Sequence, residues 1–305
     1  MKYIFELLFH FVVTLFLMIH GLIWGILKQI IPLRYRAKNI RNQNVLITGT
    51  GSGIGKLLAK KMAKLGAFCI LIDINEKKNS ETAQEIKFEN GKALTLTCDL
   101  SDKNQIFKLY HQIKKSMDHV DLLINNAGIV NGKKFLDSSD QSIEKTFNVN
   151  TLSHIWMNKA FLPDMIKKNH GHIVTISSMA GLFGAAGLCD YCASKSAIIG
   201  FDESLRNELL RLHKTGVKTT LVCPNVISTG MFNGYNSVIP ELDPYYVADK
   251  IIEAILTEQK VLLIPKIMYF LYFFKTMISH ETESYLAKYV FKTCYAMDNF
   301  KGKKE

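Results

Sequence analysis

The sequence lacks the cysteine patterns that mark disulfide-stapled or metal-bound folds. Its six cysteines include no C-x-x-C pair and no zinc-ligand spacing. We therefore interpret them as reduced, mostly buried thiols of a protein in a reducing compartment. Internal repeats and low-complexity segments are also missing. The 305 residues, 48% of them hydrophobic, fit one large domain with an appendage.

No recognised nucleic-acid-binding motif accompanies the basic charge of the chain. The formal net charge is +11 at pH 7, which on its own is compatible with a nucleic-acid partner. Much of the basic excess, however, lies beside hydrophobic segments. This arrangement favours phospholipid head groups or an anionic cofactor as partners, and we expect no nucleic acid to bind.

Charged residues are nearly absent from residues 4–27, where Glu6 is the only one. As a helix this segment would reach about 36 Å, enough for a hydrocarbon core of about 30 Å. A cleaved signal peptide is disfavoured because no small-x-small cleavage site follows the segment. A buried core helix is disfavoured because such helices are rarely apolar on every face. We expect residues 1–30 to form a membrane anchor, and leave open whether it spans the bilayer or lies on it.

Basic residues are distributed unevenly around the apolar segment 4–27. Only Lys2 precedes this segment, whereas Lys28 and a basic linker at residues 31–42 follow it. The basic side chains after the segment are Lys28, Arg34, Arg36, Lys38 and Arg41. The positive-inside rule therefore places the following domain in the cytosol, in agreement with reduced cysteines.

A glycine-rich turn follows the linker. Residues 45–72 read as a strand, the turn, a helix and a second strand, which is a βαβ unit. Gly49 permits the tight turn, Gly53 lets the backbone approach a pyrophosphate, and Gly55 lets helix and strand pack closely. Because the helix N-terminus then faces the phosphates, the unit predicts a dinucleotide site.

An acidic residue, Asp73, closes the second strand 24 residues after Gly49. A carboxylate there would accept hydrogen bonds from the adenosine ribose hydroxyls and repel a 2′-phosphate. Ile74 and Asn75 follow it, so no adjacent arginine offers a phosphate clamp. The pattern favours NAD over NADP, although Lys56 is a flexible lysine within reach of such a phosphate.

The alternation of strands and helices continues along the chain. Four more strands are predicted, at residues 93–97, 120–124, 172–177 and 218–223. Distinctive residues follow each strand at its carboxyl end, where open parallel sheets bind ligands. We therefore predict an α/β fold over residues 43–260, a Rossmann-type doubly wound parallel sheet with helices on both faces.

Three residues are candidates for the chemistry. Tyr191 and Lys195 stand four residues apart in D-Y-C-A-S-K, which puts both on one face of a helix. A phenol titrates near pH ~10, but a nearby lysine ammonium favours the phenolate and makes it a usable base. Ser178, 13 residues before the tyrosine, can hold the substrate oxygen while the proton leaves.

Four motifs in order resemble the short-chain dehydrogenase/reductase family over residues 42–260. They are T-G-x-x-x-G-x-G at 48–55, N-N-A-G at 125–128, N-V-N at 148–150, and the Ser, Tyr and Lys set. The resemblance implies a nicotinamide-dependent oxidoreductase on the fold predicted above.

The resemblance also implies roles for single residues. Tyr191 would be the catalytic acid/base, Lys195 would lower its pKa and hold the nicotinamide ribose, and Ser178 would orient the reacting oxygen. Asn150 would hold a water that links Lys195 to bulk solvent. Ser177 is the rival for the serine role, but the 13-residue spacing selects Ser178.

The remaining implied contacts concern the cofactor. Asp99 would touch the adenine and residues 126–128 would line the adenosine. With Tyr191 and Lys195, the implied cofactor set is Gly49, Ser52, Gly53, Ile54, Gly55, Asp73, Asp99, Leu100, Asn126, Ala127, Gly128, Pro224 and Thr229. The chain departs from the family at Asn225, where a glycine often follows the proline; this can alter the loop but not the reaction.

Further segments resemble the epidermal retinol dehydrogenase subgroup, membrane-bound members that oxidise retinol with NAD. They are NNAGIVNGKKFLD, AFLPDMI, GLCDYCASKSA, TTLVCPNVISTGMF and AMDNF. The implied function is NAD-dependent oxidation of a lipophilic alcohol, all-trans-retinol to retinal. Alternatives are a 17-beta-hydroxysteroid or another lipid alcohol, and, in another class, a non-catalytic lipid-surface binding protein. Oligomeric state stays open, with a homodimer as one candidate.

Residues 230–240 occupy the position of the family's substrate flap. Their apolar character suits a lipid-like alcohol, and Met231 and Phe232 are the expected substrate contacts beside Ser178. The alternative is an apolar loop with a purely structural role.

Residues 261–305 are expected to form a hydrophobic, helical, membrane-associated extension beside the active-site mouth. Residues 261–279 are aromatic and apolar but are interrupted by one proline and two lysines. Their length permits a spanning helix, their lysines favour an interfacial one, and packing on the domain or a dimer partner is the alternative. The final KGKKE resembles a dilysine retrieval signal, which indicates the endoplasmic reticulum membrane. A lipid-droplet surface is the second possibility.

Overall fold

The computed structural model describes residues 2–236 and 238–302, and the chain divides into two compact units, Met1–Asn39 and Ile40–Glu305. The first unit contains the long helix α1, Lys2–Ile30, and a 3-10 turn, Leu33–Tyr35. Within the described residues, α1 is the one helix long and apolar enough to cross a membrane, over Tyr3–Gly25. It coincides with the expected anchor.

The second unit is built on a seven-stranded sheet with the order β3-β2-β1-β4-β5-β6-β7, and all neighbours are parallel. The strands are β1 Asn44–Thr48, β2 Phe68–Asp73, β3 Lys92–Thr97, β4 Leu122–Asn125, β5 Gly171–Ile176, β6 Val217–Pro224 and β7 Val261–Ile264. The strand order reverses between β1 and β4, which creates the switch point where such sheets bind ligands. The predicted Rossmann-type fold is confirmed.

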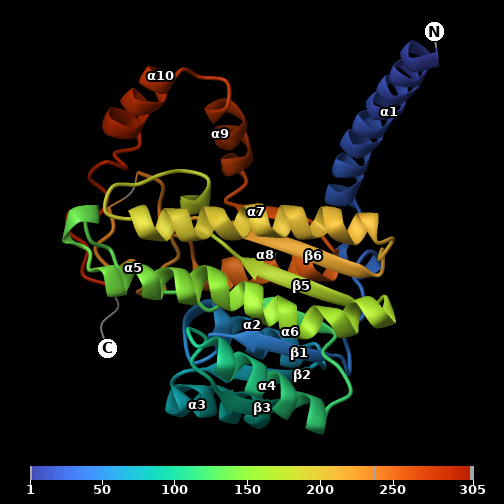
Figure 1. The fold of residues 1–305 in the computed structure, drawn as a ribbon, viewed down its shortest axis with the longest axis vertical. Helices are drawn as coiled ribbons and strands as arrows, with labels where there is room; N and C mark the ends of the chain where they lie inside the picture. The colour runs from blue at the N-terminus through green and yellow to red at the C-terminus, as the bar shows by residue number, and fades with distance from the viewer. Residues whose placement is uncertain (1, 237, 303–305) are drawn as a thin grey trace. The chain divides into compact units, whose positions relative to one another are not determined.

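Helices cover both faces of the sheet (Figure 1). On one face α2 packs against α3 and α8, and on the other α4, α6 and α7 share one core cluster with the strands. The bounds are α2 Gly53–Lys64, α3 Glu76–Phe88, α4 Lys103–Ser116, α5 Asp140–Phe147, α6 Ser153–Lys168, α7 Cys189–Arg211 and α8 Pro244–Leu256. This arrangement buries the strands from both sides, as their continuous apolar runs require.

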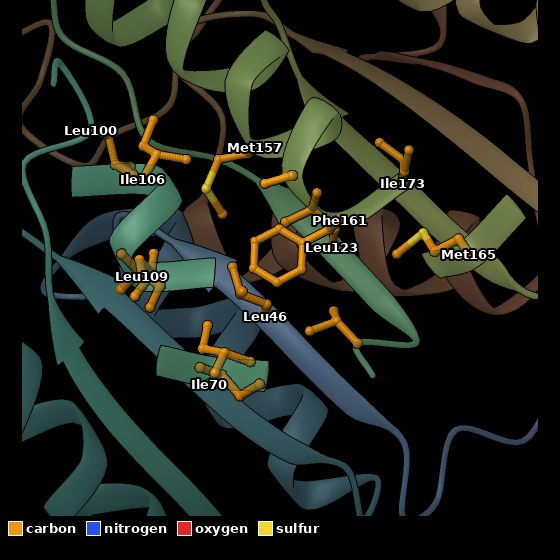
Figure 2. Close-up of a cluster of buried hydrophobic side chains, with 14 of the residues drawn as sticks. Leu46, Ile70, Leu100, Ile106, Leu109, Leu123, Met157, Phe161, Met165 and Ile173 are labelled. Atoms are coloured by element: carbon orange, nitrogen blue, oxygen red, sulfur yellow. The ribbon is translucent and has the colours of Figure 1, made fainter. Parts of the chain in front are cut away.

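The core beneath α4 and α6 fixes the position of the strands. Figure 2 shows Phe161 and Met157 of α6 pointing toward Leu46 of β1 and Leu123 of β4. All four side chains are at most 3% exposed. Because such a cluster is close-packed, the carboxyl ends of β1 and β4 are held at a fixed spacing.

Strand β7 departs from the sequence expectation. The sequence predicts a membrane-associated extension from residue 261 onward, whereas the structure pairs Val261–Ile264 with residues 221–224 of β6. A short apolar run has no periodicity that separates a buried strand from an apolar helix. The sheet thus extends past residue 260, and the helix that follows, α9 (Ile267–Lys275), is about 14 Å long and too short to span a bilayer.

The chain after α9 returns to the carboxyl ends of the strands (Figure 1). It contains α10, His280–Tyr285, and a π-helical turn, Leu286–Val290. Main-chain hydrogen bonds join Ala186 N to Thr293 O at 3.3 Å and Asn236 N to Ala296 O at 2.8 Å. The extension is therefore fastened to the loops around the ligand-binding edge. The expected retrieval signal in KGKKE lies outside the described residues from 303 onward.

Candidate active site

A cavity of about 830 Å³ lies at the carboxyl edge of the sheet. The expected site residues that line it are Gly49, Ser52, Gly53, Ile54, Asp73, Asp99, Leu100, Asn126, Ala127, Gly128, Ser178, Tyr191, Lys195, Pro224, Thr229, Met231 and Phe232. Gly55 and Asn150 are absent from the lining and lie behind it. Residues from seven separate segments thus meet in one space that can hold a large ligand.

The glycine-rich loop between β1 and α2 shapes one end of the cavity. Gly49 and Gly53 have φ angles of +72° and +58°, which side chains rarely adopt. A Cβ atom at Gly55 would lie 2.0 Å from the main-chain oxygen of Gly49, so only glycine lets α2 approach the turn. The loop presents bare backbone at the helix N-terminus, which is suited to phosphate groups.

Asp73 lies at the end of β2 beside this loop. One of its carboxylate oxygens accepts a hydrogen bond from Gly51 N and the other from Asn75 N, each at 2.8 Å. Two main-chain donors therefore fix the carboxylate in the cavity wall. A fixed negative charge there can accept hydrogen bonds from hydroxyl groups and repels a phosphate.

The segment after β4 forms the floor beneath the loop. Thr48 Oγ1 accepts hydrogen bonds from Asn126 N at 2.9 Å and Ala127 N at 3.0 Å. His154 of α6 contacts the same segment, with Nε2 donating to Ala127 O at 3.1 Å. Burial, assisted by the charge of Lys195, lowers the pKa of His154 to about 3, so the ring is neutral. Nothing in the sequence pattern singles out this histidine.

Ser178, Tyr191 and Lys195 come together in the wall of the cavity. Burial raises the pKa of Tyr191 to about 12, and a hydrogen bond with Ser178 opposes that rise. Burial lowers the pKa of Lys195 to about 8, and its Nζ donates to Ile176 O at 3.0 Å. Ser177 also lines the cavity, but its hydroxyl donates to Lys195 O at 2.9 Å. The serine beside the phenol is therefore Ser178.

Asn150 lies in a π-helical turn, Asn148–Leu152, between α5 and α6. Its amide accepts from Ile129 N at 2.8 Å and donates to Ile129 O at 2.9 Å and to Ser194 Oγ at 3.1 Å. A Cβ atom at Gly128 would meet Asn150 Oδ1 at 3.3 Å and Lys195 Nζ at 3.4 Å. The asparagine thus braces the wall next to the lysine.

Apolar side chains line the other end of the cavity. The Phe232 ring packs edge-on against Tyr191 with a centroid distance of 5.5 Å. The chain after β7 contributes Leu271, Phe274, Ile278, Leu286 and Phe291. The sequence does not identify these five as cavity residues, because an apolar segment has the same composition whether it faces lipid or a ligand.

Comparison with known proteins shows where this architecture belongs. The short chain dehydrogenase family model matches residues 43–239. Epidermal retinol dehydrogenase 2 of Mus musculus is 47% identical over 274 residues, covering 88% of each chain, and that of Homo sapiens is 44% identical over 297 residues, covering 96% and 94%. Retinol dehydrogenase 10 of Homo sapiens is 39% identical over 280 residues, covering 82% of each chain.

Solved structures share the fold of the second unit. A short chain dehydrogenase/reductase from Burkholderia phymatum in complex with NAD has a TM-score of 0.71 at 26% identity, covering 81% of this chain and 96% of its own. A metagenomic short-chain oxidoreductase in complex with NADP has a TM-score of 0.64 at 28% identity, covering 74% and 97%. The protein therefore belongs to the short-chain dehydrogenase/reductase family and is an oxidoreductase that acts on CH–OH groups.

Proposed function

We propose that the protein is an NAD-dependent, membrane-bound dehydrogenase that oxidises a lipophilic alcohol, with all-trans-retinol to retinal as the favoured reaction. The observation that carries this proposal is one cavity in which Ser178, Tyr191 and Lys195 face a space with apolar outer walls. The names of the relatives, epidermal retinol dehydrogenase 2 and retinol dehydrogenase 10, support a retinoid-like substrate.

The cavity fits a nicotinamide dinucleotide at its glycine-rich end. Gly49 and Gly53 leave room for a pyrophosphate at the start of α2, and Asp73 is placed to bind ribose hydroxyls and to disfavour a 2′-phosphate. Asp99, Thr229 and the other expected contacts line the same space. NAD supplies the hydride acceptor when bound.

Tyr191 removes the hydroxyl proton in the proposed reaction. With a pKa near 12 the buried phenol is neutral at physiological pH, so it needs help to ionise. Lys195, with a pKa of about 8, still carries its charge there and favours the phenolate electrostatically. Ser178 holds the alcohol oxygen, and Asn150 supports a water on the path from Lys195 to solvent.

The apolar walls select the substrate class. Met231 and Phe232 lie next to the reacting end, and the chain after β7 covers the remainder of the substrate. Burial of a long hydrocarbon against these walls provides most of the binding free energy. A hydroxysteroid or another lipid alcohol would use the same walls, so substrate identity must be decided by assay.

The chain is proposed to reach its substrate at a membrane. Residues 1–30 form the anchor and residues 31–42 the basic linker on the cytosolic side of the endoplasmic reticulum. The catalytic domain begins at residue 43 and includes β7. Exposed Phe270 and Phe273 of α9, and exposed Met277 just after this helix, support contact of the extension with lipid. A lipid-droplet surface and a homodimeric assembly are further possibilities for the same protein.

One assay tests the function directly. Membranes containing the protein are incubated with retinol, hydroxysteroids and long-chain alcohols, each with NAD and with NADP. We expect the highest kcat/KM for retinol with NAD. A higher kcat/KM for a steroid than for retinol would identify the steroid as the substrate. If no alcohol is oxidised, the proposed reaction is contradicted and a lipid-surface binding protein is favoured.

A further inference from the structure

The chain after β7 forms a cavity wall although its own secondary structure is short. Its helices α9 and α10 contain nine and six residues. Isolated helices of that length are unstable, so the position of the wall depends on its contacts with the catalytic domain. The main-chain bonds to Ala186 and Asn236 hold the distal part, near Thr293 and Ala296.

Lys275 holds the part of the wall formed by α9 and α10. It is the one cation among the described lining residues after β7. Its Nζ donates to Leu182 O at 2.8 Å, lies 3.3 Å from an Oε atom of Glu283, and lies 5.1 Å from the centre of the Phe183 ring. One ammonium group therefore joins the end of α9, helix α10, and the loop that follows Ser178.

These contacts control geometry more than overall stability. The side chains of Lys275 and Glu283 are 26% and 39% exposed, so solvent weakens their ion pair. The bond to Leu182 O is charge-assisted and directional. Phe183 is also in edge-on contact with Tyr272 of α9, at 6.1 Å between ring centres. Lys275 and Tyr272 together fix Phe183, which lines the cavity.

We propose that Lys275 is a specificity-determining residue that positions the apolar wall around the far end of a long alcohol. The inference rests on the proposed function and concerns the same cavity. A short alcohol occupies only the space beside Ser178 and Tyr191 and does not reach the wall. Loss of Lys275 should therefore selectively weaken the binding of long substrates. The Lys275 side chain itself takes no part in proton transfer.

The test uses three variants of the full-length protein in membranes. Lys275→Met keeps the side-chain length but removes the charge and the donor, and Lys275→Arg keeps both. Lys288→Met is the matched control, because Lys288 lies on the same extension, is exposed and does not line the cavity. The substrates are retinol and prenol, a short allylic alcohol with the same reacting end, and retinol affinity is also measured by fluorescence without turnover.

We expect Lys275→Met to raise the ratio of the retinol KM to the prenol KM about tenfold, the size expected for a lost charge-assisted hydrogen bond. Retinol affinity should fall to a similar extent, whereas Lys275→Arg and Lys288→Met should keep both values within about twofold of the unmodified protein. An unchanged ratio, an equal loss for both alcohols, or failure of arginine to rescue would overturn the assignment.

The binding measurement separates this inference from the proposed function. If the unmodified protein binds retinol but does not oxidise it, the proposed reaction fails while the role of Lys275 is still decided by the affinities. If the unmodified protein does not bind retinol at all, the assignment of a long-alcohol wall fails as well.

Discussion

The ammonium nitrogen of Lys195 lies 5.9 Å from the centre of the Tyr191 ring, one turn further along α7. Both side chains are buried, and burial moves their pKa values in opposite directions, to about 12 for the phenol and about 8 for the ammonium. Burial thus favours the neutral form of each group. The protein keeps a positive charge beside the phenol at neutral pH at a cost in folding free energy.

Tyr191→Phe should abolish turnover while leaving NAD affinity nearly unchanged. The phenylalanine ring can keep the edge-on contact with Phe232, but the proton acceptor is gone. Loss of a general base lowers kcat by a factor on the order of 10²–10⁴. Steady-state kinetics and NAD titration measure the two quantities, with exposed Tyr245→Phe as control. Substantial oxidation by Tyr191→Phe would refute the assigned mechanism.

Lys195→Met should weaken NAD binding yet stabilise the fold near neutral pH. The folded pKa of about 8 lies below the ordinary 10.5. The destabilisation caused by burying the charged lysine therefore has its full value below pH 8. That penalty disappears as pH rises to 10.5, where both states are increasingly neutral. The expected gain near neutral pH is about 3 kcal/mol.

Denaturant unfolding in detergent, near neutral pH and at pH 10.5, measures this effect. The control is Lys64→Met, which replaces an exposed lysine of α2 and should change neither value. A Lys195→Met protein that is less stable than the unmodified one near neutral pH would contradict the buried-charge argument.

His154→Gln should flatten the acid limb of the stability curve. The folded pKa of about 3 lies below the ordinary 6.5, so only the unfolded chain takes up a proton between these values. Stability from this residue is complete above pH 6.5 and is lost as pH falls toward 3. At about pH 5 the expected loss is about 2 kcal/mol, absent in the variant.

Unfolding curves recorded from pH 7 to pH 4 provide the comparison for His154, and exposed His213→Gln is the control. The His154→Gln variant should also show a raised KM for NAD, because Nε2 of His154 holds the Ala127 carbonyl in the cavity floor. An acid limb as steep as that of the unmodified protein would show that the ring is protonated in the folded state.

Asp73→Ser should reduce the preference for NAD over NADP. The change removes the carboxylate that Gly51 N and Asn75 N hold in place, and with it both the ribose acceptor and the charge that repels a 2′-phosphate. The KM for NAD should rise about tenfold. Glu76→Ser, at the exposed start of α3, is the control. Equal or better turnover of the unmodified protein with NADP would rule out the assignment.

Protease added to sealed microsomes should digest both the catalytic domain and a C-terminal tag. The basic linker at residues 31–42 favours a cytosolic domain, and α9 is too short to take the tail across the bilayer. Deletion of residues 1–30 should reduce membrane association, incompletely if α9 contacts lipid. A protected tag would show that the extension crosses, and a protected domain would reverse the orientation; detergent-opened microsomes are the control.

Local sequence was sufficient for the fold and for most of the cofactor end. The six predicted strands agree with β1 to β6 to within two residues at each end. Gly49, Gly55 and Asp73 were placed by spacing alone, because a strand, a tight turn and a helix have fixed geometry over short distances. Helix geometry likewise put Tyr191 and Lys195 on one face of α7.

The sequence by itself thus determined the βαβ framework, the residues at the strand ends and the spacing of the candidate catalytic groups. Only the tertiary structure decided that β7 completes the sheet, that His154 supports Ala127, and that Lys275 fastens an apolar wall. It also decided the pKa values of Tyr191 and Lys195. These properties depend on burial and on partners far away along the chain, whereas periodicity and spacing report only what neighbouring residues do.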